Sequence, residues 1–257
     1  MNFTDMIWEV PNSLPDDLCD ELVKKFDEDD EHRYQGESGA GLNLDIKNST
    51  EIHLGSEGWE DHDASVFKVV SRQTTEYLNL IAKKISPEED INRGEVGDYG
   101  YQIQKSSPGG HYTWHHDSTL TTILDGTYYK RDINKLRFLT ANRVATFIYY
   151  LNDSSEFEGG RTQFYFDGEI HSITPKKGLG VWFPSSDLYT HRGEKVESGD
   201  KYLVTGWIHE FAHFAGKFNS TQVSRRYRDI YDKPEEYIFP VCDNDAAAES
   251  VVNLSIE

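Results

Sequence analysis

Residues 142–164 read NRVATFIYYLNDSSEFEGGRTQF, and this stretch decides the fold class. It opens with VATFIYYL, a run of β-branched and aromatic residues that favours an extended strand. The polar, glycine-containing segment NDSSEFEGG follows as a turn signal, and RTQFYF then begins a second short run of the same character. The stretch therefore predicts consecutive strands joined by a turn.

The same alternation of short runs and turns continues on both sides of this stretch. Further runs are YGYQIQ at 99–104, GLGVWFP at 178–184 and KYLVTGWI at 201–208, with the turn signals SPGG, PKKG and ESGD between runs. Short strands with no helices between them predict an antiparallel barrel or sandwich that begins near residue 99.

Two amphipathic helices are expected before this β-rich region. The first starts at Ser13 or Asp16, has an acidic first turn and places Leu18, Leu22, Val23 and Phe26 at helical spacing. The second covers 63–85, with Phe67, Val70, Tyr77 and Ile81 on its apolar face. Residues 30–62 between the helices are polar, rich in glycine and expected to form a loop.

The sequence thus predicts a mainly β domain with flanking helices, an α+β arrangement, over 1–215. Residues 1–98 would support a β core at about 99–210, and 216–257 would form a helical extension and tail. The segment 118–143 interrupts the strand pattern with basic residues: Lys130, Arg131, Lys135 and Arg137. It is interpreted either as a lid over a site or as a solvated loop.

Composition limits the possible partners. The 257 residues carry 26 Lys and Arg against 45 Asp and Glu, a net charge of −19 that repels nucleic acid and anionic membrane surfaces. Cys19 and Cys242 are too few for a disulfide framework or a cysteine metal cluster. The N-terminal residues lack a secretory signal and no apolar run approaches a membrane span, so a soluble cytoplasmic protein is expected.

The chemistry is concentrated in PGGHYTWHHDS at 108–118. His115 and Asp117 are two positions apart near the end of an expected strand, so both side chains point to the same face. His191 follows in a later segment. Two histidines and one carboxylate on one face of a metal ion are typical of non-haem Fe(II) oxygenases.

Lys201 follows His191 by ten positions and begins the inward face of its strand, alternating with Leu203, Thr205 and Trp207. A buried lysine needs an anion. The distal carboxylate of a keto-acid co-substrate would supply one, and the phenol of Tyr112 could add a hydrogen bond.

In order along the chain, these blocks resemble the 2-oxoglutarate/Fe(II)-dependent dioxygenases, and within them the prolyl 4-hydroxylase-like branch. The resemblance covers roughly 99–210 and rests on GGHYTWHHD, on NRVATFIYYLNDSSEFEGGRTQF, on GLGVWFP and on THRGEKVESGDKYLVTGWIHE. It implies a double-stranded β-helix, a jelly-roll or cupin-like core, with Fe(II) on His115, Asp117 and His191.

The resemblance also implies a co-substrate site and a reaction. 2-Oxoglutarate would bind through Lys201 and Tyr112, with Thr162 of GGRT as a further candidate. Fe(II), 2-oxoglutarate and O2, with ascorbate as a candidate reductant, would hydroxylate an unactivated C–H bond and release succinate and CO2. The prime substrate would be a small molecule, or a peptide or protein that carries a prolyl residue.

Two positions depart from the family pattern and leave the prime substrate open. Trp114 stands where many prolyl hydroxylases carry proline, and Ser106 stands where a tyrosine is often found nine positions before the first ligand. His111 and His116 are not expected to be ligands, because each points to the strand face opposite a matched ligand or lies outside the motif.

Two other interpretations compete with this one. His209-Glu210-Phe211-Ala212-His213 matches H-E-x-x-H, the zinc motif of metalloproteases, with Glu235 as a distant third ligand. That motif needs a helix, whereas the composition of YLVTGWI favours a strand expected to end at Glu210. The third interpretation is a cupin-like module that binds a ligand without turnover.

Overall fold

The computed structural model describes residues 2–88, 95–124 and 138–213. Met1–Leu120 and Asn142–Phe211 form one compact unit, and Thr121–Ala141 and Ala212–Glu257 form a second. The core and the site described below lie in the first unit. The predicted lid residues Lys130, Arg131, Lys135 and Arg137 and the predicted extension 216–257, with Glu235, lie outside the described residues.

Two helices precede the β core, as predicted. Helix α1 (Asp16–Glu28) starts after Pro15 and buries Cys19, Leu22 and Phe26. Helix α2 (Glu60–Ile85) buries Val70, Tyr77 and Ile81. The prediction that Phe67 belongs to the buried face is wrong, because its side chain is 51% exposed and the preceding Val66 is buried instead. Short 3₁₀ turns cover Phe3–Met6 and Asp187–Tyr189.

The strands form two main sheets and a small ribbon. The large sheet has the order β1 (Trp8–Val10), β13 (Gly180–Pro184), β9 (Phe138–Tyr150), β16 (Lys201–His213), β6 (Gln102–Ser106), β4 (Thr50–His53) and β2 (Tyr34–Gln35); β5 (Glu95–Gly97) pairs with β16, and β8 (Leu120–Leu124) pairs with β9. The second sheet has the order β12 (Glu169–Ile173), β11 (Thr162–Phe166), β14 (His191–Gly193), β7 (His111–His115) and β3 (Lys47–Asn48). The ribbon pairs β10 (Glu158–Gly159) with β15 (Val196–Ser198).

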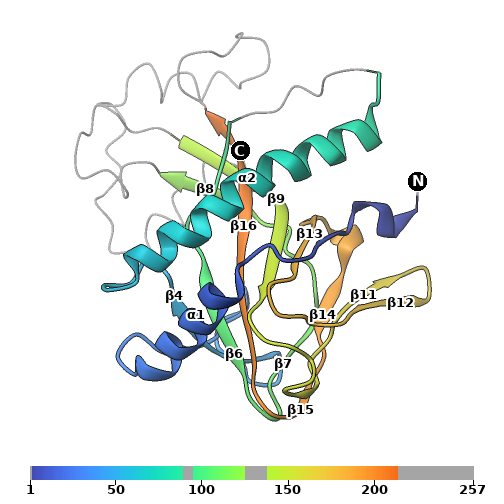
Figure 1. Cartoon of the computed structure of the whole chain (residues 1–257). Helices are drawn as coiled ribbons and strands as arrows, with labels where there is room; N and C mark the ends of the chain where they lie inside the picture. The colour runs from blue at the N-terminus through green and yellow to red at the C-terminus, as the bar shows by residue number, and fades with distance from the viewer. Residues whose placement is uncertain (1, 89–94, 125–137, 214–257) are drawn as a thin grey trace. The chain divides into compact units, whose positions relative to one another are not determined.

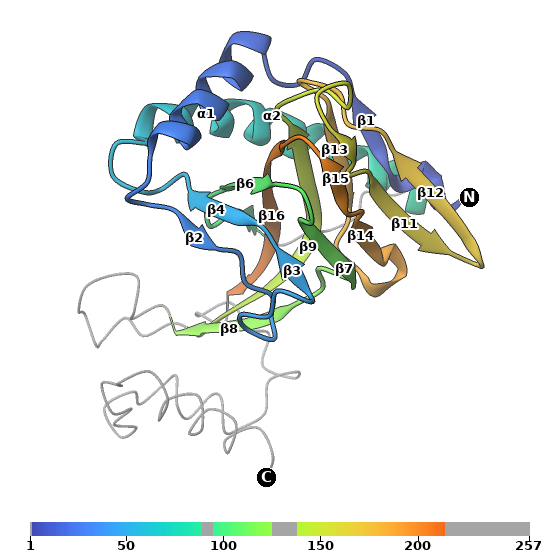
Figure 2. The same ribbon diagram turned by 90° about the horizontal axis from the view of Figure 1, so that it is seen from below.

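The two sheets lie face to face and enclose an aromatic core, while α1 and α2 lie along the large sheet (Figures 1 and 2). Phe147, Trp182 and Phe164 are fully buried in this core. The predicted mainly β architecture, a double-stranded β-helix with N-terminal helices packed on it, is confirmed.

Helix α2 is attached to the large sheet through one buried amide. The side-chain oxygen of Gln73 accepts hydrogen bonds from Tyr149 Oη (2.8 Å) and Trp182 Nε1 (2.9 Å). Its side-chain nitrogen donates to Ser13 Oγ at 2.9 Å. One residue of α2 therefore fixes the helix against β9, β13 and the segment before α1.

Two expectations about local structure are wrong. The segment 30–62 contains β2, β3 and β4. β3 pairs with β7 and β4 pairs with β6, both from the core far along the chain, while β2 pairs with β4. Strand β16 continues to His213 rather than ending at Glu210. Within the described ranges, no helix has a stretch long and apolar enough to span a membrane.

Candidate metal centre

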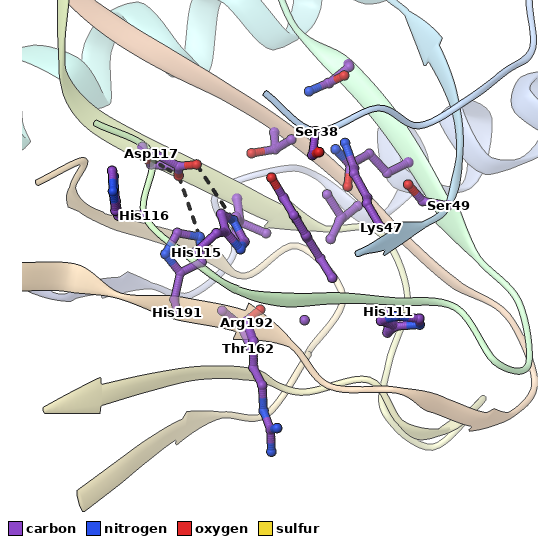
Figure 3. Close-up of a pocket in the computed structure, with 18 of the residues that line it drawn as sticks. Ser38, Lys47, Ser49, His111, His115, His116, Asp117, Thr162, His191 and Arg192 are labelled. Carbon is purple, nitrogen blue, oxygen red and sulfur yellow. Dashed lines mark hydrogen bonds and ion pairs between the residues drawn. The ribbon is translucent and has the colours of Figure 1, made fainter. Parts of the chain in front are cut away.

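Three side chains converge between the two sheets. His115 ends β7, Asp117 follows two residues later, and His191 begins β14 directly opposite His115 in the strand register. One ligand atom from each lies within 4.8 Å of the others. Nε2 of His115 is 3.7 Å from Asp117 Oδ1, and Nε2 of His191 is 3.5 Å from Asp117 Oδ2 (Figure 3).

The hydrogen bonds of the two histidines orient them for a metal ion. Nδ1 of His115 donates to the carbonyl oxygen of Thr113 at 2.7 Å, and Nδ1 of His191 donates to that of Tyr189 at 3.0 Å. A proton held on Nδ1 leaves a lone pair on Nε2, the atom that faces Asp117. Two imidazole nitrogens and one carboxylate are the donor set of a non-haem Fe(II) site with open positions.

The protonation states of these side chains also suit a cation. Burial, together with the neighbouring His191, lowers the pKa of His115 to about 3. Burial alone would raise the pKa of Asp117, but His191, His115 and a hydrogen bond from Thr146 outweigh it, so that this pKa is lowered. At neutral pH the site therefore offers a neutral His115 and an ionised carboxylate.

Thr146 holds Asp117 from the large sheet, and the sequence analysis did not identify it. Its hydroxyl donates to Asp117 Oδ2 at 2.8 Å and lies 2.9 Å from Ser185 Oγ. Asp117, Thr146 and Ser185 are all buried. The signal in the sequence was a lone hydroxyl residue inside the apolar run VATFIYY, since a buried hydroxyl needs a partner.

The three side chains line a cavity of about 560 Å³, and so do Lys201, Thr162 and Tyr112. Lys201 is only 4% exposed and lies opposite Ser106 in the strand register. Burial lowers its pKa to about 8, and no carboxylate of the described residues forms an ion pair with its ammonium. A buried ammonium without a counter-ion is a group that an anion would stabilise.

Thr162 lines the cavity near Lys201, and the buried Tyr150 lies behind it. Tyr150 Oη donates to Thr162 Oγ1 at 2.6 Å, and the Lys201 ammonium is 5.4 Å from the centre of the Tyr150 ring. Tyr150, which the sequence analysis did not single out, thereby links the predicted Thr162 to the predicted lysine.

Tyr112 occupies another wall. Its ring stacks on the His115 imidazole, with centres 3.5 Å apart and planes 18° apart. Arg143, also not identified from sequence, lines the cavity with its guanidinium carbon 3.8 Å from the centre of the Trp207 ring. Its Nε is buried without a hydrogen-bond partner in the described structure. An arginine directly before the apolar run VATFIYYL was the available signal.

The H-E-x-x-H match lies on a strand. His209 and His213 both belong to β16, four residues apart. The zinc motif needs a helix, so the structure gives no support to the zinc-protease interpretation. His111 and His116 line the cavity but are not among the three residues whose ligand atoms converge.

Comparisons with known proteins agree with this geometry. Residues 101–209 match the model of the 2OG-Fe(II) oxygenase superfamily. The chain is 34% identical over 149 residues to the prolyl 4-hydroxylase subunit alpha-1 of Gallus gallus, covering 55% of this chain and 25% of that protein. It is 25% identical over 177 residues to a PKHD-type hydroxylase of Prochlorococcus marinus, covering 68% of this chain and 66% of the relative. The chain thus spans a quarter of the length of the Gallus gallus protein and about two thirds of the length of the Prochlorococcus marinus protein.

Solved structures share the fold at low identity. A prolyl hydroxylase of Trichoplax adhaerens, in complex with a hypoxia inducible factor peptide fragment, superposes with a TM-score of 0.56 at 15% identity, covering 80% of this chain and 84% of that one. A Pseudomonas putida prolyl-4-hydroxylase gives a TM-score of 0.53 at 17% identity, covering 78% and 91%. Residues 101–209 are thus similar to the 2OG-Fe(II) oxygenase superfamily, and the solved structures share the fold.

Proposed function

We propose that the protein is an Fe(II)- and 2-oxoglutarate-dependent dioxygenase that hydroxylates an unactivated C–H bond. The observation that carries the proposal is the convergence of His115, Asp117 and His191 in one cavity with an unpaired, buried Lys201. A binding module without turnover needs neither open metal positions nor a second site for an anion.

In this proposal His115, Asp117 and His191 would hold Fe(II), and a set of three protein ligands would leave coordination positions for the co-substrates. Bound together, Fe(II), 2-oxoglutarate and O2 supply the oxidation that inserts one oxygen atom into the C–H bond and the other into succinate, with release of CO2. Ascorbate is proposed as the reductant that keeps the iron ferrous.

The chain's own residues position the co-substrate. The Lys201 ammonium would bind the distal carboxylate, and a charge-assisted hydrogen bond of this kind contributes roughly 1.5–3 kcal/mol. Thr162, already bonded to Tyr150, would add a polar contact at the same end. Tyr112, whose ring stacks on His115, would add a hydrogen bond to the co-substrate through its phenol.

The proposed prime substrate is a prolyl residue of a peptide or protein. The support is the likeness of the core to proteins named prolyl 4-hydroxylase. The cavity walls beyond the metal ligands and Lys201 are rich in amide, hydroxyl and cationic side chains, among them Gln102, Gln104, Ser38 and Arg143. Such groups can pair with the carbonyl and amide groups of a peptide backbone.

The test combines co-substrate turnover with a peptide screen. Purified protein with Fe(II), 2-oxoglutarate, ascorbate and O2 should form succinate, and proline-containing peptides in the mixture should gain the mass of one oxygen atom. His115→Ala, Asp117→Ala and His191→Ala should each abolish succinate formation. Undiminished turnover in any of these variants would refute the ligand assignment. Succinate without any modified peptide would leave the dioxygenase activity standing and refute the prolyl substrate.

A further inference from the structure

A buried ion pair lies against the cavity but outside the segment that matches the superfamily. Lys47 on β3 and Glu51 on β4 are 5% and 1% exposed, with Lys47 Nζ 2.6 Å from Glu51 Oε1. Ser49 Oγ donates to the same carboxylate oxygen at 2.8 Å. All three residues precede residue 101, where the family match begins.

The ion pair fixes a segment of backbone at the cavity. Lys47 Nζ also donates to the carbonyl oxygen of Glu37 at 3.2 Å. Gly36 passes so close to the pair that an added Cβ would lie within 2.5 Å of Ser49 Oγ and Glu51 Oε1, and its amide donates to the carbonyl of Ser49 at 2.8 Å. Residues 37–39, which follow directly, line the cavity.

The same lysine contacts the ring that covers a metal ligand. Lys47 is opposite Tyr112 in the register of β3 and β7, and its ammonium is 5.3 Å from the centre of the Tyr112 ring. Tyr112 in turn stacks on His115. Lys47 therefore connects Glu51, the carbonyl of Glu37 and the Tyr112 ring, and Figure 3 shows it on the same wall as Ser38 and Ser49.

We propose that Lys47 and Glu51 are a positioning pair that holds the cavity-lining residues 37–39 as the prime-substrate wall and keeps water from the metal. The inference rests on the proposed function, in which the three ligands and Lys201 account for the metal and the co-substrate and leave this wall for the prime substrate. A buried ion pair is not required for stability, since apolar residues can replace one without loss. The pair instead provides directed contacts from the Lys47 ammonium to the Glu51 carboxylate, the Glu37 carbonyl oxygen and the Tyr112 ring.

The experiment separates this positioning role from a purely structural one. Lys47→Met or Glu51→Met alone leaves one buried charge without a partner and should lower Tm by roughly 10 °C. The double variant Lys47→Met/Glu51→Met removes both charges and should keep Tm near that of the unmodified protein. The matched control is Lys177→Met/Asp20→Asn, which removes an exposed ion pair that does not line the cavity.

Three measurements need no prime substrate. Amide hydrogen exchange is measured at Ser38 and Gly41, whose backbone amides each donate a hydrogen bond to the carbonyl oxygen of the other residue. Titrations give the affinities for Mn(II) and, with Mn(II) bound, for 2-oxoglutarate. The relaxation rate of water protons in the Mn(II)-loaded protein reports how freely water reaches the metal.

In the double variant, exchange at Ser38 and Gly41 should become roughly tenfold faster or more, and water-proton relaxation should increase. The affinities for Mn(II) and 2-oxoglutarate should stay within twofold, and the control should change nothing. Unchanged exchange and relaxation in a stable double variant would overturn the inference. So would a loss of Mn(II) affinity, because the pair would then act on the ligands rather than on the wall. If the unmodified protein itself fails to bind 2-oxoglutarate, it is the proposed function that fails.

Discussion

At the scale of single residues, the direction of the Asp117 carboxylate depends on Thr146. The Thr146 hydroxyl donates to Oδ2, which is also the oxygen nearer to His191, while Oδ1 faces His115. A partner of this kind orients a metal ligand without touching the metal. The neighbouring Ser185 extends the arrangement to the end of β13.

We expect Thr146→Val to weaken metal binding while the fold persists. Valine keeps the shape of threonine but cannot donate to Asp117, and loss of such a partner typically reduces metal affinity about 10- to 100-fold. Calorimetric titration with Mn(II) measures the change. Thr146→Ser, which retains the hydroxyl, should stay close to the unmodified protein. An unchanged affinity in Thr146→Val would show that Asp117 is held by other contacts.

Lys201→Met should make the protein more stable at pH 7 while it weakens 2-oxoglutarate binding by roughly 10- to 100-fold. Burial lowers the pKa of Lys201 from 10.5 to about 8, so below pH 8 the folded state carries a penalty on the order of 3 kcal/mol. The unfolded chain binds more protons between pH 8 and 10.5, so the unmodified protein should gain stability over that range, a gain that the variant lacks.

Urea unfolding of both proteins at pH 7 and pH 9.5, without 2-oxoglutarate, measures this difference. Lys177→Met serves as the control because its ammonium lies at the surface beside Asp20. A Lys201→Met variant less stable than the unmodified protein at pH 7 would contradict the assignment of an unpaired ammonium.

At the scale of elements, helix α2 depends on Gln73 for its attachment to the sheet. We expect Gln73→Met to destabilise the fold by roughly 2–4 kcal/mol, because Tyr149, Trp182 and Ser13 each lose a hydrogen-bond partner in a buried place. Denaturant unfolding gives the change. Phe67→Ala, on the exposed side of the same helix, should change stability by about 0.5 kcal/mol or less. Equal effects of the two substitutions would refute this account of the docking.

The elements also separate what the sequence predicts from what it does not. Long β-branched and aromatic runs predicted β9, β13 and β16, because their composition is local information. The two-residue strands β2 and β3 carry no such signal. β3 exists because the core strand β7 pairs with it, and β2 pairs with β4, which in turn pairs with the core strand β6.

The site divides in the same way. Spacing and order pointed to His115, Asp117, His191 and Lys201, which the structure brings into one cavity. Thr146 and the Lys47–Glu51 pair were not found, because their roles come from contacts between separate strands. Helical periodicity predicted that Phe67 would be buried, but it is exposed and the preceding Val66 is buried instead.

At the scale of the whole molecule, the N-terminal segment supplies strands to both sheets of the core. β1, β2 and β4 join the large sheet, and β3 joins the second sheet. Residues 101–209 are thus the part that matches the superfamily, but they form their sheets together with residues that precede them. The chain has a net charge of −19, yet three basic side chains line its cavity: Lys201, Lys47 and Arg143.

Metal binding should stabilise this whole assembly, because the three ligands come together only in the folded state. At about 100 times its Kd, Mn(II) should add about 2.7 kcal/mol, which corresponds to a rise in Tm of roughly 5–10 °C. Thermal unfolding with and without Mn(II) measures the rise. Asp117→Ala should show little of it, and an equal rise in that variant would place the metal elsewhere.

The unpaired ammonium of Lys201 has a consequence for how long the protein survives in a cell. Under the proposed function, an anion that binds only the folded chain relieves the penalty of that charge and reduces the fraction that unfolds. Unfolded chains are the ones that proteases remove. The abundance of the protein would therefore follow the supply of its co-substrate, and a shortage would decrease the amount of enzyme as well as its rate.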